Sequence, residues 1–386
     1  MTIRVAQDCW LENEGWRHHE TALAGDQAGL VLVFGATTLL RDEALLSDIR
    51  NRYPHALMVG CSTAGEICDT RVRDGSLSVT AVSFEHTRLD FAETRIDADG
   101  SRAAGERLAR KLDQPGLAHV LVLSDGLQVN GTELVIGLRE NLPLRVAVTG
   151  GLAGDGDCFS QTLVCVQGTS EEGRIVAVGF YGDRLKIGYG SLGGWDSFGP
   201  ERLITRSRGN VLYELDGQSA LGLYKRYLGE HAAGLPSTGL LFPLALRSGA
   251  EQGSTGQGDG LVRTILAIDE QAQSMTFAGD MPEGRYAQLM KANFDRLVGG
   301  AVAAATTSSL LLGYAVPQLA ILISCVGRKL VLKQRVEEEV EGVRNVFGIS
   351  TALAGFYSYG EIAPHLPLGS CELHNQTMTI TAFAEE

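Results

Sequence analysis

The residues best suited to chemistry lie in two short loops that share one pattern, a glycine, four further residues and then Gly-Glu-Ile. The first loop is GCSTAGEI at residues 60–67, and the second is GFYSYGEI at residues 355–362. A Gly-x4-Gly loop can cradle phosphate, but that chemistry needs a lysine where this chain has Glu66 and Glu361. A carboxylate repels phosphate, so nucleotide binding is not expected. The glycines would instead permit a tight exit from a strand, and each glutamate would bond backbone amides or cap a turn.

The recurrence of this pattern in both halves predicts that the two loops face one ligand pocket. Polar side chains at strand ends are where pockets commonly form. The predicted ligand-binding residues are the polar members of the two loops and an asparagine that follows the second: Cys61, Ser62, Thr63, Glu66, Tyr357, Ser358, Tyr359, Glu361 and Asn375.

Three other patterns argue against familiar enzyme sites. GYGSLG at residues 188–193 matches GxGxxG, but a turn follows it where a dinucleotide site needs a helix. No GxSxG nucleophile elbow occurs. Cys61 could be a nucleophile, yet no histidine is fixed beside it. We therefore expect a protein that is not an enzyme, and an enzyme using Cys61 or Glu66 is the third hypothesis.

Composition limits the partners and the compartment. The 386 residues include 33 basic and 46 acidic ones, for a net charge of −13, which disfavours nucleic acid and anionic lipid. Seven scattered cysteines without CxxC spacing, and a start without an apolar signal segment, predict a reduced cytoplasmic protein. Residues 297–327 carry no charge, but polar residues divide them into a helix and the strand LAILISC, so no membrane insertion is expected.

The elements that would position the loops form a repeated unit. An apolar strand at 30–34, a helical pattern and a strand at 56–60 precede the first loop, and the strand 319–325 with a helical segment at 328–343 precedes the second. Apolar strands joined by helices imply mixed or parallel sheets covered by those helices. The predicted fold is mixed α/β (α+β), with two related lobes, each a mixed sheet with flanking helices, arranged as a pseudo-twofold duplication.

Five segments in one order carry a resemblance to a known family. They are GCSTAGEI, HVLVLSDG, TGGLAGDG, GGWDSFGP with ITRSRGNVLYELDG, and GFYSYGEIAP with LHNQT. Over about residues 28 to 383 the chain resembles FIST proteins, in which a FIST-N domain precedes a FIST-C domain. The resemblance implies an intracellular signalling sensor with an N-terminal extension at 1–27, FIST-N at 28–215 and FIST-C at 216–386. Because the two domains leave no room for an output domain, signalling through a partner protein is expected.

Within that family the chain is similar to the stand-alone nitric-oxide sensors of the NosP type, and this similarity implies a cofactor and a partner. Such proteins bind haem b and modulate a histidine kinase. The implied axial ligand is His374 in LHNQT, with His365 as the second candidate, and the absence of CxxCH implies noncovalent attachment. A small polar metabolite such as an amino acid is the alternative ligand, and it would be held by Ser62, Thr63, Glu66, Tyr357, Glu361 and Asn375. Self-association into a homo-oligomer is compatible with either.

Overall fold

The computed structural model describes most of the chain, and His365 lies outside the described residues. The described residues are 3–18, 23–112, 115–247, 260–313, 315–364 and 369–386.

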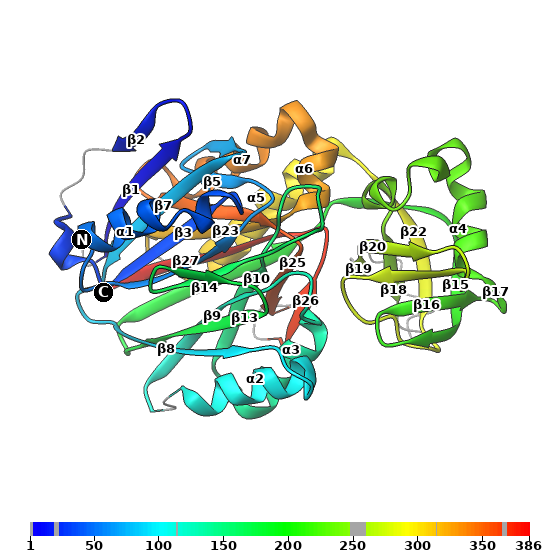
Figure 1. Ribbon diagram of the computed structural model, residues 1–386, viewed down its shortest axis with the longest axis horizontal. Helices are drawn as coiled ribbons and strands as arrows, with labels where there is room; N and C mark the ends of the chain where they lie inside the picture. Colours follow the sequence, from blue (N-terminus) through cyan, green and yellow to red (C-terminus); the bar gives the residue numbers. More distant parts are fainter. Residues whose placement is uncertain (1–2, 19–22, 113–114, 248–259, 314, 365–368) are drawn as a thin grey trace.

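Three mixed sheets with the same strand order form the larger body of the molecule (Figure 1). In each sheet two parallel strands lie at the centre, a returning strand pairs antiparallel with the first of them, and a hairpin pairs antiparallel with the second. The first sheet contains the parallel pair β3 (Leu30–Gly35) and β4 (Leu57–Ser62), with β7 (Ser76–Ser83), β1 (Arg4–Leu11), β2 (Gly15–His18) and the hairpin β11 (Val164–Val166) and β12 (Thr169–Glu171).

The other two sheets repeat this plan. The second contains the parallel pair β9 (Leu117–Ser124) and β10 (Ala147–Leu152), with β13 (Arg174–Tyr181), β8 (Arg88–Arg95) and the hairpin β25 (Gly360–Pro364) and β26 (Cys371–His374). The third contains the parallel pair β23 (Leu319–Cys325) and β24 (Ala352–Ser358), with β27 (Met378–Glu385), β14 (Leu185–Leu192) and the hairpin β5 (Glu66–Cys68) and β6 (Arg71–Arg73).

Each hairpin belongs to a different sheet from the strand that precedes it. The hairpin after β4 joins the third sheet, the hairpin after β10 joins the first, and the hairpin after β24 joins the second. This exchange is cyclic, so the body has pseudo-threefold symmetry.

Three glycines mark the equivalent point of the three units. Gly60, Gly150 and Gly355 each lie opposite a residue of the neighbouring parallel strand. A Cβ atom would lie 1.8 Å from the carbonyl oxygen of that residue at Gly60 and Gly355, and 1.9 Å at Gly150. The strands therefore approach each other more closely than any side chain would allow. The middle copy of the loop is GGLAGD at residues 150–155, which is one residue shorter and ends in aspartate.

Helices cover the sheets and join the parallel strands. The side chain of Asp42 caps the first of them by accepting bonds from the amides of Ala44 and Leu45, and Asn130 caps the helix before β10 in the same way. The helices are α1 (Glu43–Arg52), α2 (Gly100–Lys111), α3 (Gly131–Asn141), α5 (Phe294–Leu311), α6 (Val326–Leu332) and α7 (Val336–Phe347), with short 3-10 turns η1 (Gly25–Gln27), η2 (Leu39–Arg41) and η5 (Lys333–Arg335).

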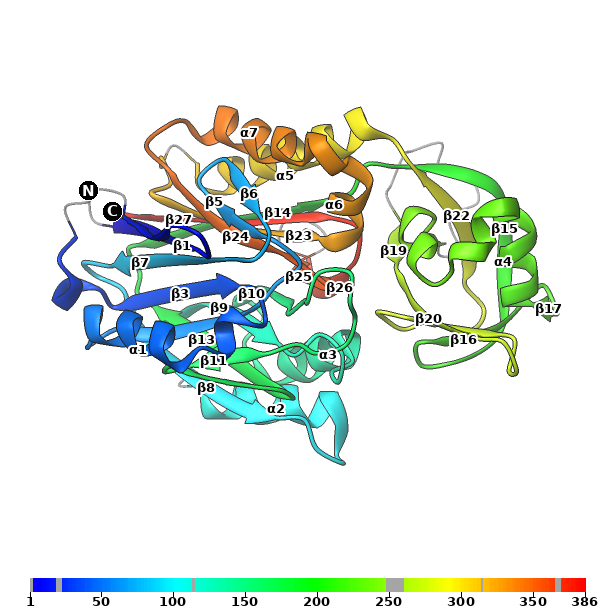
Figure 2. The ribbon, with the colours of Figure 1, turned by 45° about the horizontal axis from the view of Figure 1, so that its top comes forward.

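A smaller domain is inserted between β14 and α5, and both views show it to one side of the three sheets (Figures 1 and 2). An eight-stranded sheet encloses a core of its own, which includes Leu212, Leu221 and Phe277. Its elements are β15 (Trp195–Arg208), β16 (Val211–Leu215), β17 (Gln218–Ser219), α4 (Ala220–Leu228), η3 (Gly229–Gly234), η4 (Ser237–Leu241), β18 (Leu244–Arg247), β19 (Leu261–Arg263), β20 (Ile265–Asp269), β21 (Ser274–Phe277) and β22 (Tyr286–Ala292).

The predicted fold class is confirmed, because several mixed sheets with flanking helices make up the chain. The repeated unit is present, and the structure adds a third copy. The uncharged stretch at 297–327 forms most of α5 and then β23, as its pattern predicts. Among the described residues, no helix is both long and apolar enough to cross a membrane.

Candidate functional site: a polar cavity between the three units

A cavity of about 820 Å³ lies where strand ends of all three units meet. The first unit contributes the loop after β3, the turn between β4 and β5, and the turn before β7. The second contributes the loop at 155–161, and the third contributes α6, η5 and the start of α7. Because the carboxyl ends of β3, β4, β10 and β23 all point here, the fold delivers loop residues from distant parts of the sequence to one place. The volume suits a small molecule.

The cavity carries charges of both signs. The ammonium group of Lys329 on α6 already has protein partners, because its Nζ donates to Ala64 O at 2.7 Å and forms an ion pair with Asp74. Arg41 and Lys333 are exposed and form no ion pair within the described residues. The acidic lining residues are Glu66, Asp74, Asp155 and Asp157.

The lining includes a buried hydroxyl without a hydrogen-bond partner among the described residues. Thr37 Oγ1, in the loop that follows β3, is buried and forms no hydrogen bond within the described part of the chain. A buried hydroxyl left unpaired costs about 1–3 kcal/mol, so such a group normally has a hydrogen-bond partner, which can be a protein atom, a water or a ligand.

The loop at 155–161 is held rigidly against the third unit. Asp155 accepts hydrogen bonds from the amides of Phe159, Ser160 and Gln161 at 2.8–2.9 Å, and also from the hydroxyl of Tyr359. The rings of Phe159 and Tyr359 stack with their centroids 4.5 Å apart. Tyr359 therefore positions this loop, which forms one wall of the cavity, although Tyr359 itself is not part of the lining.

Glu66 closes the turn that begins with Thr63. Its carboxyl group accepts bonds from Thr63 Oγ1 at 2.6 Å and from the amide and hydroxyl of Ser76 at 3.2 and 2.7 Å. Burial raises the pKa of Glu66 to about 7, although these hydrogen bonds oppose the shift. Glu66 and Thr63 both line the cavity.

Glu361 repeats this arrangement in the third unit. It accepts bonds from Ser358 Oγ at 2.6 Å and from the amide and hydroxyl of Thr377 at 3.2 and 3.0 Å. Burial raises the pKa of Glu361 to about 8. Glu361 lies on β25, beside β10 of the second sheet, and is not among the residues that line the cavity. Both glutamates thus bond a backbone amide and fasten the start of a returning strand.

The remaining loop residues pack inside the sheets. Cys61 is fully buried in β4, and burial raises the pKa of its thiol well above the usual value. Ser62 Oγ accepts a bond from the amide of Leu163 at 2.8 Å. Tyr357 donates to Glu339 at 2.6 Å, and Asn375 Nδ2 donates to the carbonyl of Tyr359 at 3.3 Å.

His374 does not fit a haem ligand in this structure. The residue is 4% exposed, and its Nε2 lies 3.0 Å from the carbonyl oxygen of Ala363. An axial ligand needs a ring nitrogen that faces an open cavity, and His374 is not part of the lining of the 820 Å³ cavity. No group of three or more His, Cys, Asp or Glu side chains suited to a metal ion occurs among the described residues.

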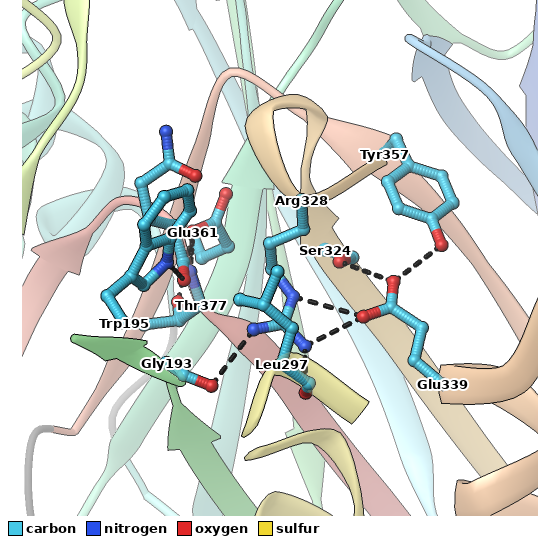
Figure 3. A network of polar contacts seen from close by, with 10 residues as sticks. Gly193, Trp195, Leu297, Ser324, Arg328, Glu339, Tyr357, Glu361 and Thr377 are labelled. Atoms are coloured by element: carbon cyan, nitrogen blue, oxygen red, sulfur yellow. Dashed lines mark hydrogen bonds and ion pairs between the residues drawn. The ribbon is translucent and has the colours of Figure 1, made fainter. Parts of the chain in front are cut away.

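A buried ion pair joins α6 to α7 (Figure 3). Arg328 and Glu339 are both 0% exposed, and Arg328 Nη2 lies 2.7 Å from Glu339 Oε2. Arg328 also donates to the carbonyl oxygens of Gly193 and Leu297 at 3.0 and 2.7 Å. Glu339 accepts bonds from Tyr357 at 2.6 Å and Ser324 at 3.1 Å. The neighbour of Arg328 in sequence, Lys329, reaches the cavity.

A polar cavity built by loops on repeated mixed sheets is the arrangement of a protein that binds a small ligand. The FIST N domain family matches residues 29–218, and the FIST C domain family matches residues 220–364. The chain therefore belongs to the FIST family, whose domains indicate a ligand-binding sensor. No curated protein matches the chain. A solved structure, of cyanuric acid hydrolase from A. caulinodans, is similar over 95% of this chain and 92% of that one, with 8% identity and a TM-score of 0.36. A likeness this low carries no inference about activity.

The residues that sequence reasoning missed are Thr37, Arg41, Lys329 and Lys333. They follow the first parallel strand of their units, whereas the predicted residues cluster after the second. The signal was present, since Thr37 comes directly after an apolar strand and Lys329 comes just after LAILISC.

Proposed function

We propose that this FIST protein senses a small zwitterionic metabolite, such as an amino acid, in the 820 Å³ cavity and passes the signal to a partner protein. The observation that carries the proposal is the lining itself. It combines acidic side chains with two cations and a hydroxyl that have no partner in the described part of the chain, in a volume suited to a small molecule.

The two charge signs suit the two ends of an amino acid. Arg41 and Lys333, which form no ion pair among the described residues, are available for a carboxylate, and Thr37, whose hydroxyl lacks a partner among those residues, also lines the cavity. Asp157 is an exposed acid of the lining that can receive an ammonium group. Asp155 is saturated by its own loop and serves to position that loop.

The sensor works by binding, without turnover. Support for this comes from Cys61, whose thiol is buried in the sheet with its pKa raised, so that the nucleophilic thiolate is disfavoured. Glu66 is bonded on both oxygens, which leaves it a role in the turn.

Haem b with a histidine kinase partner, the first prediction from the sequence, is the second candidate here, because the implied ligand His374 is not part of the lining of the 820 Å³ cavity. A visible spectrum of protein purified from haem-fed cells tests it directly. A Soret band that shifts with nitric oxide would replace the amino-acid proposal. A folded protein without such a band would remove the haem alternative.

Calorimetric titration with the twenty standard amino acids tests the proposal. We expect at least one to bind, and we expect Thr37→Val and Arg41→Ala to weaken it about tenfold each, the worth of one charge-assisted hydrogen bond. Arg208→Ala is the matched control, because Arg208 is exposed on β15 of the inserted domain. No heat of binding with any amino acid, or equal affinity in all three variants, would refute it.

A further inference from the structure

Three arginines are buried in the described part of the chain, and they differ in their ion pairs. Arg328 is paired with Glu339, and Arg174 is paired with Glu171 at 2.6 Å. Arg263, which is 5% exposed, has no carboxylate within ion-pair distance among the described residues. A buried guanidinium without a counter-charge is costly, and burial lowers the pKa of Arg263 to about 10.

Two of the three guanidinium nitrogens of Arg263 donate hydrogen bonds to backbone carbonyls. Its Nε donates to the carbonyl of Asp280 at 3.2 Å, and its Nη1 donates to the carbonyls of Leu373 and Val262 at 2.9 and 3.4 Å. Its Nη2 has no partner within the described residues. Since Arg263 lies on β19 and Leu373 on β26, the side chain bridges the inserted domain and the three-sheet body.

A second cavity, of about 280 Å³, lies beside this side chain at the junction of the two domains. Arg139 from α3 and Arg285 from the inserted domain line it together with Arg263, and neither forms an ion pair within the described residues. The acids of the lining are Asp280, which accepts a bond from Asn130 Nδ2 at 2.9 Å, and Glu372.

The charged and apolar side chains that line this cavity indicate the chemical class of its ligand. Three arginines against two carboxylates leave one positive charge, so a monoanion would neutralise the cavity. The wall also has apolar side chains, which include Ile136, Leu246 and Leu261. We propose that this junction binds a small organic monocarboxylate, with its carboxylate on Arg263 Nη2 and its apolar body against these side chains.

The site is separate from the cavity between the three units, so the proposal stands or falls apart from the amino-acid proposal. A carboxylate here would bond residues of both domains, and it would therefore stabilise their docking by linkage.

Titration of the full chain with benzoate and with butyrate, observed by calorimetry, tests the proposal, and inorganic phosphate serves as the comparison anion. We expect benzoate or butyrate to bind. Arg139→Ala and Arg285→Ala, which change exposed side chains and should leave the fold intact, should weaken that binding about tenfold. Arg263→Lys should weaken it as well, because a single ammonium group cannot keep the bonds to the carbonyls of Asp280 and Leu373 and also reach the carboxylate from the position of Nη2. Arg208→Ala should bind as the natural protein does.

Three results would overturn the assignment. One is the failure of both carboxylates to bind at millimolar concentration. Another is binding of phosphate without either carboxylate. The third is carboxylate binding that is lost in Arg41→Ala but kept in Arg139→Ala, because that would place the anion in the cavity between the units.

Discussion

Removal of Glu339 should be among the most destabilising single changes in this chain. The carboxyl group neutralises Arg328, which is 0% exposed, and it accepts bonds from Tyr357 and Ser324. Breaking a fully buried pair by deleting one partner costs about 3–5 kcal/mol, because an uncompensated charge stays inside. We therefore expect Glu339→Ala to lower the free energy of unfolding by at least about 3 kcal/mol.

The double variant Arg328→Met with Glu339→Ala separates the cost of the orphaned charge from the loss of packing. It removes the charge altogether, although the carbonyls of Gly193 and Leu297 lose their donor. We expect it to be more stable than Glu339→Ala alone, since an unpaired ion costs more than an unpaired carbonyl.

Urea unfolding monitored by circular dichroism measures all the variants under one condition. The matched control is Glu140→Ala, which breaks an exposed pair with Arg102 and should leave the urea midpoint unchanged. If Glu339→Ala cost less than about 1 kcal/mol, or if the double variant were less stable than Glu339→Ala, the reasoning from burial would be wrong.

Three further predictions follow from the loops and the cavity. The pKa values of Glu66 and Glu361 in the folded protein, about 7 and about 8, lie above the usual 4.5, so their contribution to stability is complete below pH 4.5 and is lost as pH rises towards 8. Glu66→Gln with Glu361→Gln should flatten the urea midpoint over that range, and an unchanged pH profile would contradict the shifts. Cys158 is the one exposed cysteine of seven and lines the 820 Å³ cavity, so it should react first with DTNB, more slowly when the cavity is occupied; Cys158→Ser, which should remove the fast phase, is the control. Gly355→Ala would place a Cβ 1.8 Å from the carbonyl oxygen of Leu322 and should lower the free energy of unfolding in urea by about 3 kcal/mol or more. Gly299→Ala is the control, because no atom lies within 4 Å of the added Cβ and no steric clash is expected.

The sequence revealed the repeat where residue identity preserved it. Gly60 with Glu66 and Gly355 with Glu361 share spacing, and the structure gives the two pairs the same register and the same hydrogen bonds. The sequence pattern did not reveal the middle copy, because its loop is one residue shorter and ends in Asp155, whose carboxylate accepts hydrogen bonds from amides of its own loop. Spacing alone therefore found two units of three.

The exchange of hairpins between sheets could not be predicted from local patterns. The segment after β4 reads as a short strand in any sheet, and its pairing with β24 is a contact across about 290 residues of sequence. For the same reason the prediction of one pocket lined by both loops could not separate Glu66 from Glu361. The two carboxyl groups are equivalent in their units, yet only Glu66 lies in the lining of the cavity.

The helix α6 contacts both the cavity and the chain segments that lead to and from the inserted domain. Lys329 lies in the lining of the cavity, while Arg328 holds the carbonyls of Gly193 and Leu297. Gly193 lies where the chain leaves β14 for the inserted domain, and Leu297 lies in the first turn of α5, where the chain returns from that domain. A shift of α6 must strain one or both of these bonds, since a buried guanidinium cannot replace them with water. We therefore expect Lys329→Met, which frees α6 from Ala64 and Asp74, to change amide hydrogen exchange at Gly194 and in the first turn of α5. Exchange that changes only in the turns around residues 64 and 74 would show that α6 does not transmit the perturbation.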